Sequence, residues 1–480
     1  MTASALADAL ARTGGTIRAE PLTAWNCILN SDTPIISPAV PACVFTPACV
    51  ADVLAACTAA ARLGVKVSGR GSGHHYGGMS LVQGGLVLDL SRLNSVQVDL
   101  VTRTARVGPA ASARALRAAA APHGLHFTLP HLSDVGLGGF ILGAYLGVVT
   151  ELVLRLHPVP PRLRLITAVY PLEQLEQVGS FYRDWLATAA PCLDPSVALV
   201  GPPPAAANDV EGDGASGGGE GGGGSGGGSA TSRAVVLLGC HSFAGEGDEA
   251  TEAAYARVRA LLPASRLSLE EGLVPYEEAL SVLDPAWNWP GVCLYGHGAF
   301  MPVQALQGGP GGTLAALWAA AAAMTSPRSI LLLAPAASAQ PPGLLAAGGG
   351  GVAPSSLCFR DTLYVGLYGM WTRTAGGAEA DGDAAHVAWV RSVRSALAAA
   401  PAPPAAVPAA ASGSAAPPST AAAPSPSSAS GPASALVGHY VNEVMHDEPG
   451  QARLCYDGPT LARLLELKRR VDPRGLLREL

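Results

Sequence analysis

Apolar positions along the first part of the chain predict strands that alternate with helices. An Ala/Val/Leu-rich stretch with helical spacing opens at Pro47 and stops near Gly64, and the short apolar run Val65–Val67 follows it. Gly85–Leu90 has the length and composition of a buried strand. Ser95–Val107 alternates polar and apolar residues about a central turn, so we expect a β-hairpin there.

Capping residues mark the next helix. Ser112 is a suitable N-cap for an Ala-rich helix over Ala113–Ala121, and Pro122 and Gly124 end it. Gly147–Leu156 is expected to form a strand. Beyond it, strands continue to alternate with Ala-rich helices.

Two tracts have compositions that cannot build a core. Residues 202–232 are rich in Gly, Ser and Asp, and residues 396–435 consist almost entirely of Ala, Pro and Ser. Such segments bury too little apolar surface to offset chain entropy, so we expect disordered surface insertions. A third stretch, 335–352, is expected to be a loop. The 480 residues that include these tracts are enough for two domains.

Charge and cysteine content narrow the functional classes. The net charge of −6 provides no basic field for nucleic acid or anionic lipid, so we expect a small molecule as the partner and no protein partner is implied. Nine scattered cysteines, without a CxxC pair, argue against a disulfide framework and a thiolate zinc site. No secretory signal or membrane span is recognised, and Leu314–Met324 suits a buried helix. A cytoplasmic or other reduced intracellular compartment is therefore expected.

Arg70–Gly78, with the sequence RGSGHHYGG, carries the strongest chemical signal. Glycines allow positive φ angles and let backbone N–H groups approach an anion such as a dinucleotide pyrophosphate. The loop follows a strand without opening a helix, so it differs from a Rossmann fingerprint. Taken by itself, the loop favours an ordinary Gly-rich surface turn that happens to include two histidines, because isolated Gly-rich loops are weak signals.

The flanking residues resemble the FAD-binding domain of the berberine-bridge-enzyme-like oxidases, in the vanillyl-alcohol-oxidase class. The motifs occur in the family's order at Trp25–Asn26, Cys43–Pro47, Arg70–Ser80, Gly85–Gly108 and Val135–Gly143. The C-terminal motifs of the family are matched at Gly438–Glu443, Cys455–Asp457 and Arg463–Pro473.

This resemblance implies an α+β fold with a PCMH-type FAD-binding domain formed by both chain ends. Residues 1–163 and 436–480 would form that domain, and residues 164–395 a central α/β substrate domain with an antiparallel sheet. Residues 396–435 would link the substrate domain to the C-terminal segment.

The resemblance also implies which residues hold the cofactor. FAD would be attached covalently through His74 by a single bond, because Leu132 stands where bicovalent members have a cysteine. His75 would be a wall residue. The expected cofactor-binding residues are Arg70, Gly71, Ser72, Gly73, His74, His75, Gly136, Gly138, Gly139, Val149 and Asn442.

Family members oxidise an alcohol or C–H group by hydride transfer to flavin, with dioxygen as the usual acceptor. Tyr440 is the candidate catalytic base, and a packed tyrosine with a satisfied hydroxyl is the alternative. Glu443 lies three residues further on, which would put it on the opposite face of a strand from Tyr440. It is therefore not assigned a role.

One departure from the family pattern concerns the segment after Gly143. Here Gly143–Leu146 runs directly into Gly147, and a family segment with two strands and flavin contacts is missing between 144 and 147. A truncated splice or gene-model form, or a non-catalytic remnant that no longer binds FAD, therefore remains an alternative hypothesis.

A weaker alternative is a histidine metal site. His123, His126 and His131 form an H-x2-H-x4-H cluster, and imidazoles suit zinc. No HExxH motif accompanies them, so we expect no metal. Gly296–Ala299 likewise lacks a GxSxG elbow that would indicate a hydrolase.

Overall fold

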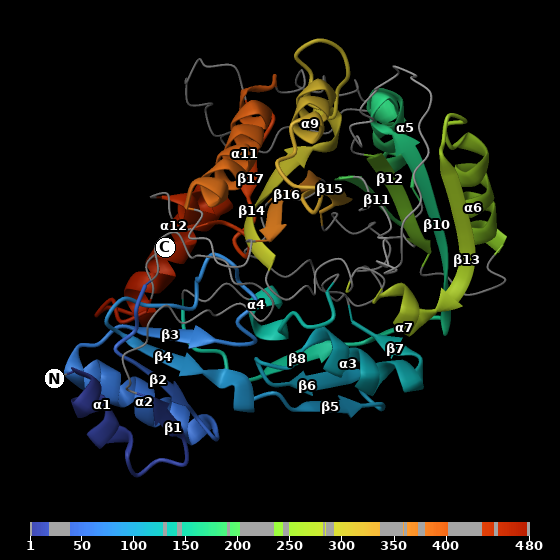
Figure 1. Cartoon of the computed structure of the whole chain (residues 1–480). Coiled ribbons are helices and arrows are strands. Elements are labelled where there is room, and N and C mark those ends of the chain that lie inside the picture. The colour runs from blue at the N-terminus through green and yellow to red at the C-terminus, as the bar shows by residue number, and fades with distance from the viewer. Residues whose placement is uncertain are drawn as a thin grey trace, which may run out of the picture.

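The computed structural model of the chain places two regions side by side, one built on small sheets and the other on one large sheet (Figure 1). It describes residues 2–18, 39–127, 132–141, 146–189, 193–201, 235–242, 249–281, 284, 292–336, 359, 362–372, 380–401, 434–445 and 450–477. The predicted insertion 202–232 lies outside these residues, as do the greater parts of 335–352 and 396–435.

The first region begins with a four-stranded sheet in the order β1-β2-β4-β3. Its strands are β1 (Thr16–Arg18), β2 (Cys43–Thr46), β4 (Leu86–Asp89) and β3 (Val67–Arg70). Helices α1 (Thr2–Leu10) and α2 (Val50–Leu63) pack together beside it. Gly64 ends α2 at a φ of 66°, as expected from the sequence. The apolar side chains of α2 and the central strands form one buried cluster.

Strand β3 starts later than the apolar pattern indicates. The sequence predicts a strand over Val65–Val67 and a loop from Ser68, whereas Val67–Arg70 is paired with Leu86–Asp89 of β4. Because β4 pairs with them in parallel, the first residues of the Gly-rich segment belong to the sheet. The Gly-rich loop therefore begins directly at the end of β3.

Smaller sheets complete this region. They contain β5 (Val96–Asp99), β6 (Thr104–Val107), β8 (Leu152–Arg155), β7 (Leu125–His126) and β9 (His157–Pro158). The predicted hairpin is confirmed, because β5 and β6 pair antiparallel. Helix α3 (Ala113–Ala120) is capped by the Ser112 hydroxyl, which accepts from the Ala115 N–H at 3.2 Å. The strand expected over Gly147–Leu156 is shorter, since it pairs only with the four residues of β6.

The second region is built on an eight-stranded antiparallel sheet in the order β13-β10-β12-β11-β15-β16-β14-β17. Its strands are β13 (Ser268–Pro275), β10 (Arg162–Pro171), β12 (Val235–Ser242), β11 (Leu193–Val200), β15 (Ile330–Pro335), β16 (Thr362–Thr372), β14 (Val292–Pro302) and β17 (Gly438–His439). The α+β fold class and the antiparallel sheet predicted from the sequence are confirmed.

Helices cover one face of this sheet (Figure 1). They are α5 (Leu175–Leu186), α6 (Glu249–Leu261), α9 (Thr313–Ala322) and α11 (Ala380–Ala399). Helix α11 continues four residues into the tract expected to be a disordered linker from 396, because alanine is the strongest helix former. None of the described helices is both long and apolar enough to cross a bilayer.

The C-terminal segment returns to the first region. Helix α12 (Gly458–Val471) is followed by a turn in which Asp472 accepts the N–H groups of Leu476 and Leu477 at 2.8 and 2.9 Å. The Val67 N–H of β3 then donates to the Leu476 carbonyl at 2.7 Å. Both chain ends therefore build the same region.

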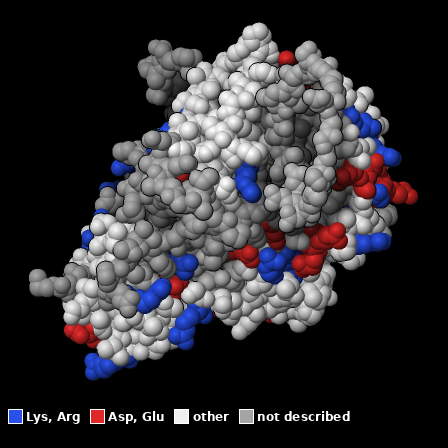
Figure 2. Space-filling view, viewed as in Figure 1, with Lys and Arg blue, Asp and Glu red and all other residues white. Residues whose placement is uncertain are grey.

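An ion pair joins α3 to the short helix α7 (Tyr276–Ala279), which follows β13 of the large sheet. The buried guanidinium of Arg117 contacts Glu277 at 2.5 Å and the Ser133 hydroxyl at 2.9 Å. Figure 2 shows acidic and basic side chains interspersed near this junction, without a continuous basic field on the visible face.

Two buried tyrosines of the large-sheet region allow a matched test of hydrogen bonding in its core. The Tyr182 hydroxyl donates to the carbonyls of Pro195 and Leu333, at 3.2 and 3.3 Å. The buried Tyr170 hydroxyl has no hydrogen-bond partner among the described residues. We expect Tyr182→Phe to lower the free energy of unfolding by about 1 kcal/mol, and Tyr170→Phe to leave it unchanged or raise it. Urea unfolding of both variants measures the difference, and equal losses would contradict this assignment.

Candidate active site

The Gly-rich loop leaves β3 at Arg70. The Arg70 guanidinium contacts the Asp89 carboxylate of β4 at 3.0 Å, and both side chains are largely buried. Gly73 and Gly78 have φ angles of 75° and 68°, in the left-handed region that favours glycine. An ion pair between neighbouring strands thus fixes the start of the loop, and the two glycines let it curve back.

A second loop packs directly on the first. The Gly136 N–H donates to the Ser72 hydroxyl at 2.9 Å, and a Cβ at Gly136 would lie only 2.6 Å from that oxygen. A Cβ at Gly138 would lie 2.6 Å from the Pro109 carbonyl oxygen, which is also 3.1 Å from a Cβ built at Gly71. Gly136 therefore lets the two loops touch at Ser72, and Gly71 and Gly138 let both loops pack on Pro109.

His74 and His75 differ in their surroundings. His74 Nδ1 is buried and has no hydrogen-bond partner within the described part of the chain. Burial lowers the pKa of His74, and the charge of Asp134 opposes this only in part, so the imidazole is neutral at pH 7. His75 Nδ1 accepts the Gly77 N–H at 3.0 Å, and its ring stacks on Tyr76.

The C-terminal segment brings Tyr440 and Asn442 to these loops. β17 pairs with β14, and the Tyr440 N–H then donates to the Gly298 carbonyl at 2.8 Å. The Asn442 amide donates to the Tyr440 hydroxyl at 3.1 Å and to the Phe140 carbonyl at 3.2 Å. Phe140 belongs to α4 (Leu137–Ile141), which begins in the second glycine loop. Tyr440 and Asn442 therefore lie together beside that loop.

The prediction that Glu443 points away from Tyr440 is wrong. The chain turns after β17, and the Glu443 N–H donates to the Tyr440 carbonyl at 2.9 Å. A Cβ built at Gly298 would lie 2.9 Å from Glu443 Oε2 and 3.0 Å from Tyr440 Cβ. Because residues 440–443 form a turn, the two-residue period of a strand does not apply.

Three further tyrosines surround Glu443. The hydroxyls of Tyr364 and Tyr368 both donate to Glu443 Oε2, the second at 2.8 Å. The Tyr76 hydroxyl lies 3.4 Å from the Glu443 carbonyl oxygen. We call Tyr76, Tyr364, Tyr368, Tyr440 and Glu443 the tyrosine–glutamate cluster.

Glycines make room for this cluster on the sheet. In β14 and β16, Gly296 lies opposite Tyr368 and Gly298 lies opposite Gly366. A Cβ at Gly296 would be 3.0 Å from the Tyr76 ring, and one at Gly366 would be 2.5 Å from the Tyr368 ring. This face of the sheet is therefore lined by tyrosine rings that occupy the space above glycines.

Sequence reasoning missed four members of the cluster: Tyr76, Tyr364, Tyr368 and Glu443. A signal was present in β16, where Tyr364, Gly366 and Tyr368 alternate and so share one face. The contact with Tyr76 and the C-terminal turn joins distant parts of the chain, and no local pattern indicates it.

Burial controls the ionisation of the cluster. It raises the pKa of Glu443, although the hydroxyls of Tyr364 and Tyr368 oppose this by hydrogen bonding to the carboxylate. Burial and the nearby Glu443 raise the pKa of Tyr440 to about 12. The phenols are therefore protonated at neutral pH, and Glu443 is the acidic group among them.

Comparison with known proteins identifies the first region. Residues 41–154 match the family model of an FAD binding domain. Residues 41–154 are thus similar to an FAD-binding domain, and we refer to the first region by that name. FAD-linked oxidoreductase penO from Penicillium crustosum is 29% identical over 113 residues, which are 24% of this chain and 25% of that protein. The match thus spans about a quarter of the length of the curated relative.

Two solved structures share the fold over nearly the whole chain. 6-Hydroxy-D-nicotine oxidase from Arthrobacter nicotinovorans has a TM-score of 0.67 at 16% identity and covers 97% of both chains. Glucooligosaccharide oxidase from Acremonium strictum, with a 6-S-cysteinyl, 8α-N1-histidyl FAD, has a TM-score of 0.66 at 13% identity and covers 98% and 97%. The predicted family resemblance is confirmed for the FAD-binding domain and for the fold.

The geometry of the FAD-binding domain fits a flavin dinucleotide at three points. The two glycine loops meet, His74 offers a buried nitrogen without a partner among the described residues, and a Cβ at Gly139 would meet no atom within 4 Å. Val149 lies before β8, where its neighbour Val148 packs against Gly69 of β3. Residues 142–145, where the sequence suggests a missing segment, lie outside the described residues.

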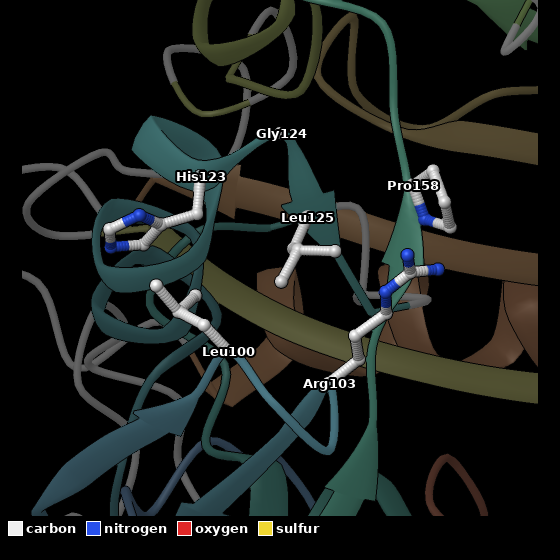
Figure 3. Close-up of a pocket in the computed structure, with 6 residues that line it drawn as sticks. All are labelled: Leu100, Arg103, His123, Gly124, Leu125 and Pro158. Atoms are coloured by element: carbon white, nitrogen blue, oxygen red, sulfur yellow. The ribbon is translucent and has the colours of Figure 1, made fainter.

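The histidines of the alternative metal site do not converge in the described structure. His126 pairs across strands with His157 and contacts the Tyr276 hydroxyl at 3.2 Å, whereas His131 lies outside the described residues. His123 borders an open hollow of about 360 Å³ with its ring turned away from Arg103 (Figure 3). Within the described ranges, no three His, Cys, Asp or Glu side chains are placed to hold a metal.

Proposed function

We propose that the protein is an FAD-dependent oxidoreductase that oxidises an alcohol or C–H group of a small organic molecule, with dioxygen as the electron acceptor. One observation carries the proposal: Asn442 joins α4 of the FAD-binding domain to the tyrosine–glutamate cluster of the large sheet. A cofactor held by the glycine loops would thus lie next to a group of phenols and a carboxylate.

Chain residues from both glycine loops would hold the cofactor. Gly136 lies against Ser72, and Gly71 and Gly138 lie against Pro109, so the loops that would surround the cofactor are packed together. His74 would form a single covalent bond to the flavin, as in the histidyl linkage of the glucooligosaccharide oxidase. When bound, FAD supplies the hydride acceptor.

Tyr440 would contact the substrate oxygen. Its hydroxyl is held by the Asn442 amide, which fixes its direction. Because its pKa is about 12, the phenol donates a hydrogen bond at neutral pH and accepts a proton only as it passes its own proton on. The sheet face with its tyrosine rings would pack against the substrate and exclude water.

Gly139 tests whether the cofactor approaches the second loop. Gly139→Ala should leave the unfolding free energy of the flavin-free protein unchanged, or raise it by up to about 1 kcal/mol, since the position is helical and open. The same methyl group should weaken FAD binding if the flavin fills that space. Flavin titration of refolded His74→Ala protein, with and without Gly139→Ala, measures this, because unfolding removes FAD only where the covalent bond is absent. Unaltered affinity would place the cofactor elsewhere.

A spectrum of the purified protein tests the proposed function against the non-catalytic alternative. Bound flavin, together with peroxide release from one of a panel of alcohols that includes xylobiose and benzyl alcohol, is the expected result. Colourless protein after expression with excess FAD would support a remnant that no longer holds the cofactor.

A further inference from the structure

Glu443 is a buried carboxylate that the proposed function leaves without a role. Phenol hydroxyls supply its described hydrogen bonds, and no described Lys, Arg or His side chain forms an ion pair with it. Burying an ionised carboxylate without a cation costs free energy. Removing either phenol hydroxyl would destabilise the ionised form of Glu443 further. Buried ionisable groups with shifted pKa values cluster at functional sites, where a change of protonation state is used.

We propose that Glu443 accepts the proton that the substrate loses, through the phenol of Tyr364 or Tyr368. This rests on the proposed oxidation and names the proton acceptor for it. Glu443 is thus a residue that acts through its hydrogen-bonded phenols, and Tyr440 is the neighbour that orients the substrate.

The step balances with the oxidant of the proposed function. The substrate C–H bond breaks, and both of its electrons leave as hydride to the flavin. The O–H bond breaks, its proton moves to a phenol oxygen, and the proton of that phenol moves to Glu443 while the carbonyl double bond forms. The carboxyl group later returns its proton to solvent.

Direct contacts connect the cluster to the glycine loop that would hold the cofactor. The Tyr364 and Tyr440 rings meet edge-on, with their centroids 5.7 Å apart. Glu443 lies against Gly298, and the Gly298 carbonyl accepts the Tyr440 N–H. Asn442 then connects Tyr440 to α4 of the FAD-binding domain. Direct contacts therefore join Glu443 and its two phenol partners to the second glycine loop.

The pH dependence follows from the groups that face Glu443. These are Tyr364 and Tyr368 of β16, Tyr76 of the Gly-rich loop with His75 stacked on it, and Tyr440 of the C-terminal turn. Because burial raises the pKa of Glu443, the carboxylate is protonated over a wider acidic range than an exposed glutamate. Below that pKa it cannot accept a proton, so the rate should fall on the acid side.

Glu443→Gln tests the proposal, since it keeps the shape of the side chain and an acceptor oxygen. We expect the rate of anaerobic flavin bleaching by xylobiose or benzyl alcohol to fall about 100-fold or more, with loss of the acid limb of its pH profile. Flavin content and the unfolding midpoint should stay near those of the wild type. A loss below about threefold, or an unchanged acid limb, would overturn the proposal.

Tyr368→Phe provides a second variant that keeps the carboxylate. It removes a hydroxyl that stabilises the ionised form, so the pKa of Glu443 should rise and the acid limb should move to higher pH. A merely structural role for Glu443 predicts no such movement.

Infrared difference spectra of the flavin-loaded protein separate this proposal from the proposed function. A protonated carboxyl band that titrates with pH in the wild type and is absent in Glu443→Gln is expected, whatever the substrate. If neither alcohol bleaches the bound flavin, the proposed function fails for them. The absence of a Glu443-dependent band would overturn the proton-acceptor role independently.

Discussion

Acid precipitation should leave a yellow pellet with the wild-type protein and a colourless one with His74→Ala. His74 Nδ1 is buried without a hydrogen-bond partner among the described residues, and the imidazole is neutral at pH 7, so its lone pair is available to bond the flavin ring. Flavin absorbance of the pellet and of the supernatant is the measurement. Essentially all flavin of His74→Ala should be found in the supernatant, and essentially all flavin of the wild type in the pellet.

His75→Ala is the matched control for this experiment. The neighbouring imidazole already accepts the Gly77 N–H and stacks on Tyr76, so its removal should leave the flavin attached. Retention of flavin by precipitated His74→Ala would refute covalent attachment at this residue. Release by both variants would indicate that the loop, rather than one bond, retains the cofactor.

Tyr440→Phe should lower kcat about 100-fold or more for the alcohol that the wild type oxidises fastest. The variant removes the hydroxyl that the Asn442 amide holds beside α4, while the ring can still fill its place against Phe300 and Tyr364. Bound flavin should be unchanged, so peroxide release per flavin is the measurement.

Tyr276→Phe serves as the control for Tyr440→Phe. Its hydroxyl is also partly buried and hydrogen-bonded, at 3.2 Å from His126 Nδ1, but it lies in α7 beside the α3 junction. It should retain wild-type turnover. A decrease below about threefold in Tyr440→Phe would show that the Tyr440 phenol does not contact the reacting group.

Local patterns in the sequence predicted much of the FAD-binding domain. The helix that ends at Gly64, the β5–β6 hairpin and the Ser112 cap each depend on neighbouring residues, and the structure contains all three. The boundaries of β3 and β8 were missed because their lengths depend on the strands with which they pair. Roles of the individual cofactor-binding residues stay predictions.

The candidate site was predicted less completely. The family motifs predicted that Tyr440 and Asn442 lie near the glycine loops. In the structure the Asn442 amide donates a hydrogen bond to the Phe140 carbonyl. Glu443 was excluded on the assumption of a continuing strand, although the chain turns after His439. Its contacts with Tyr364 and Tyr368 depend on the arrangement of distant strands, which a single sequence does not specify.

The hydrogen bond between Val67 and Leu476 constrains the order of events during synthesis. Edge strand β3, from which the Gly-rich loop departs, obtains this partner from a segment that the ribosome makes long after β3 itself. Asn442 and the cluster around Glu443 are likewise made late. The proposed cofactor site can thus be completed only after residue 476 has been synthesised, and flavin loading is expected to follow the synthesis of this segment rather than that of the Gly-rich loop.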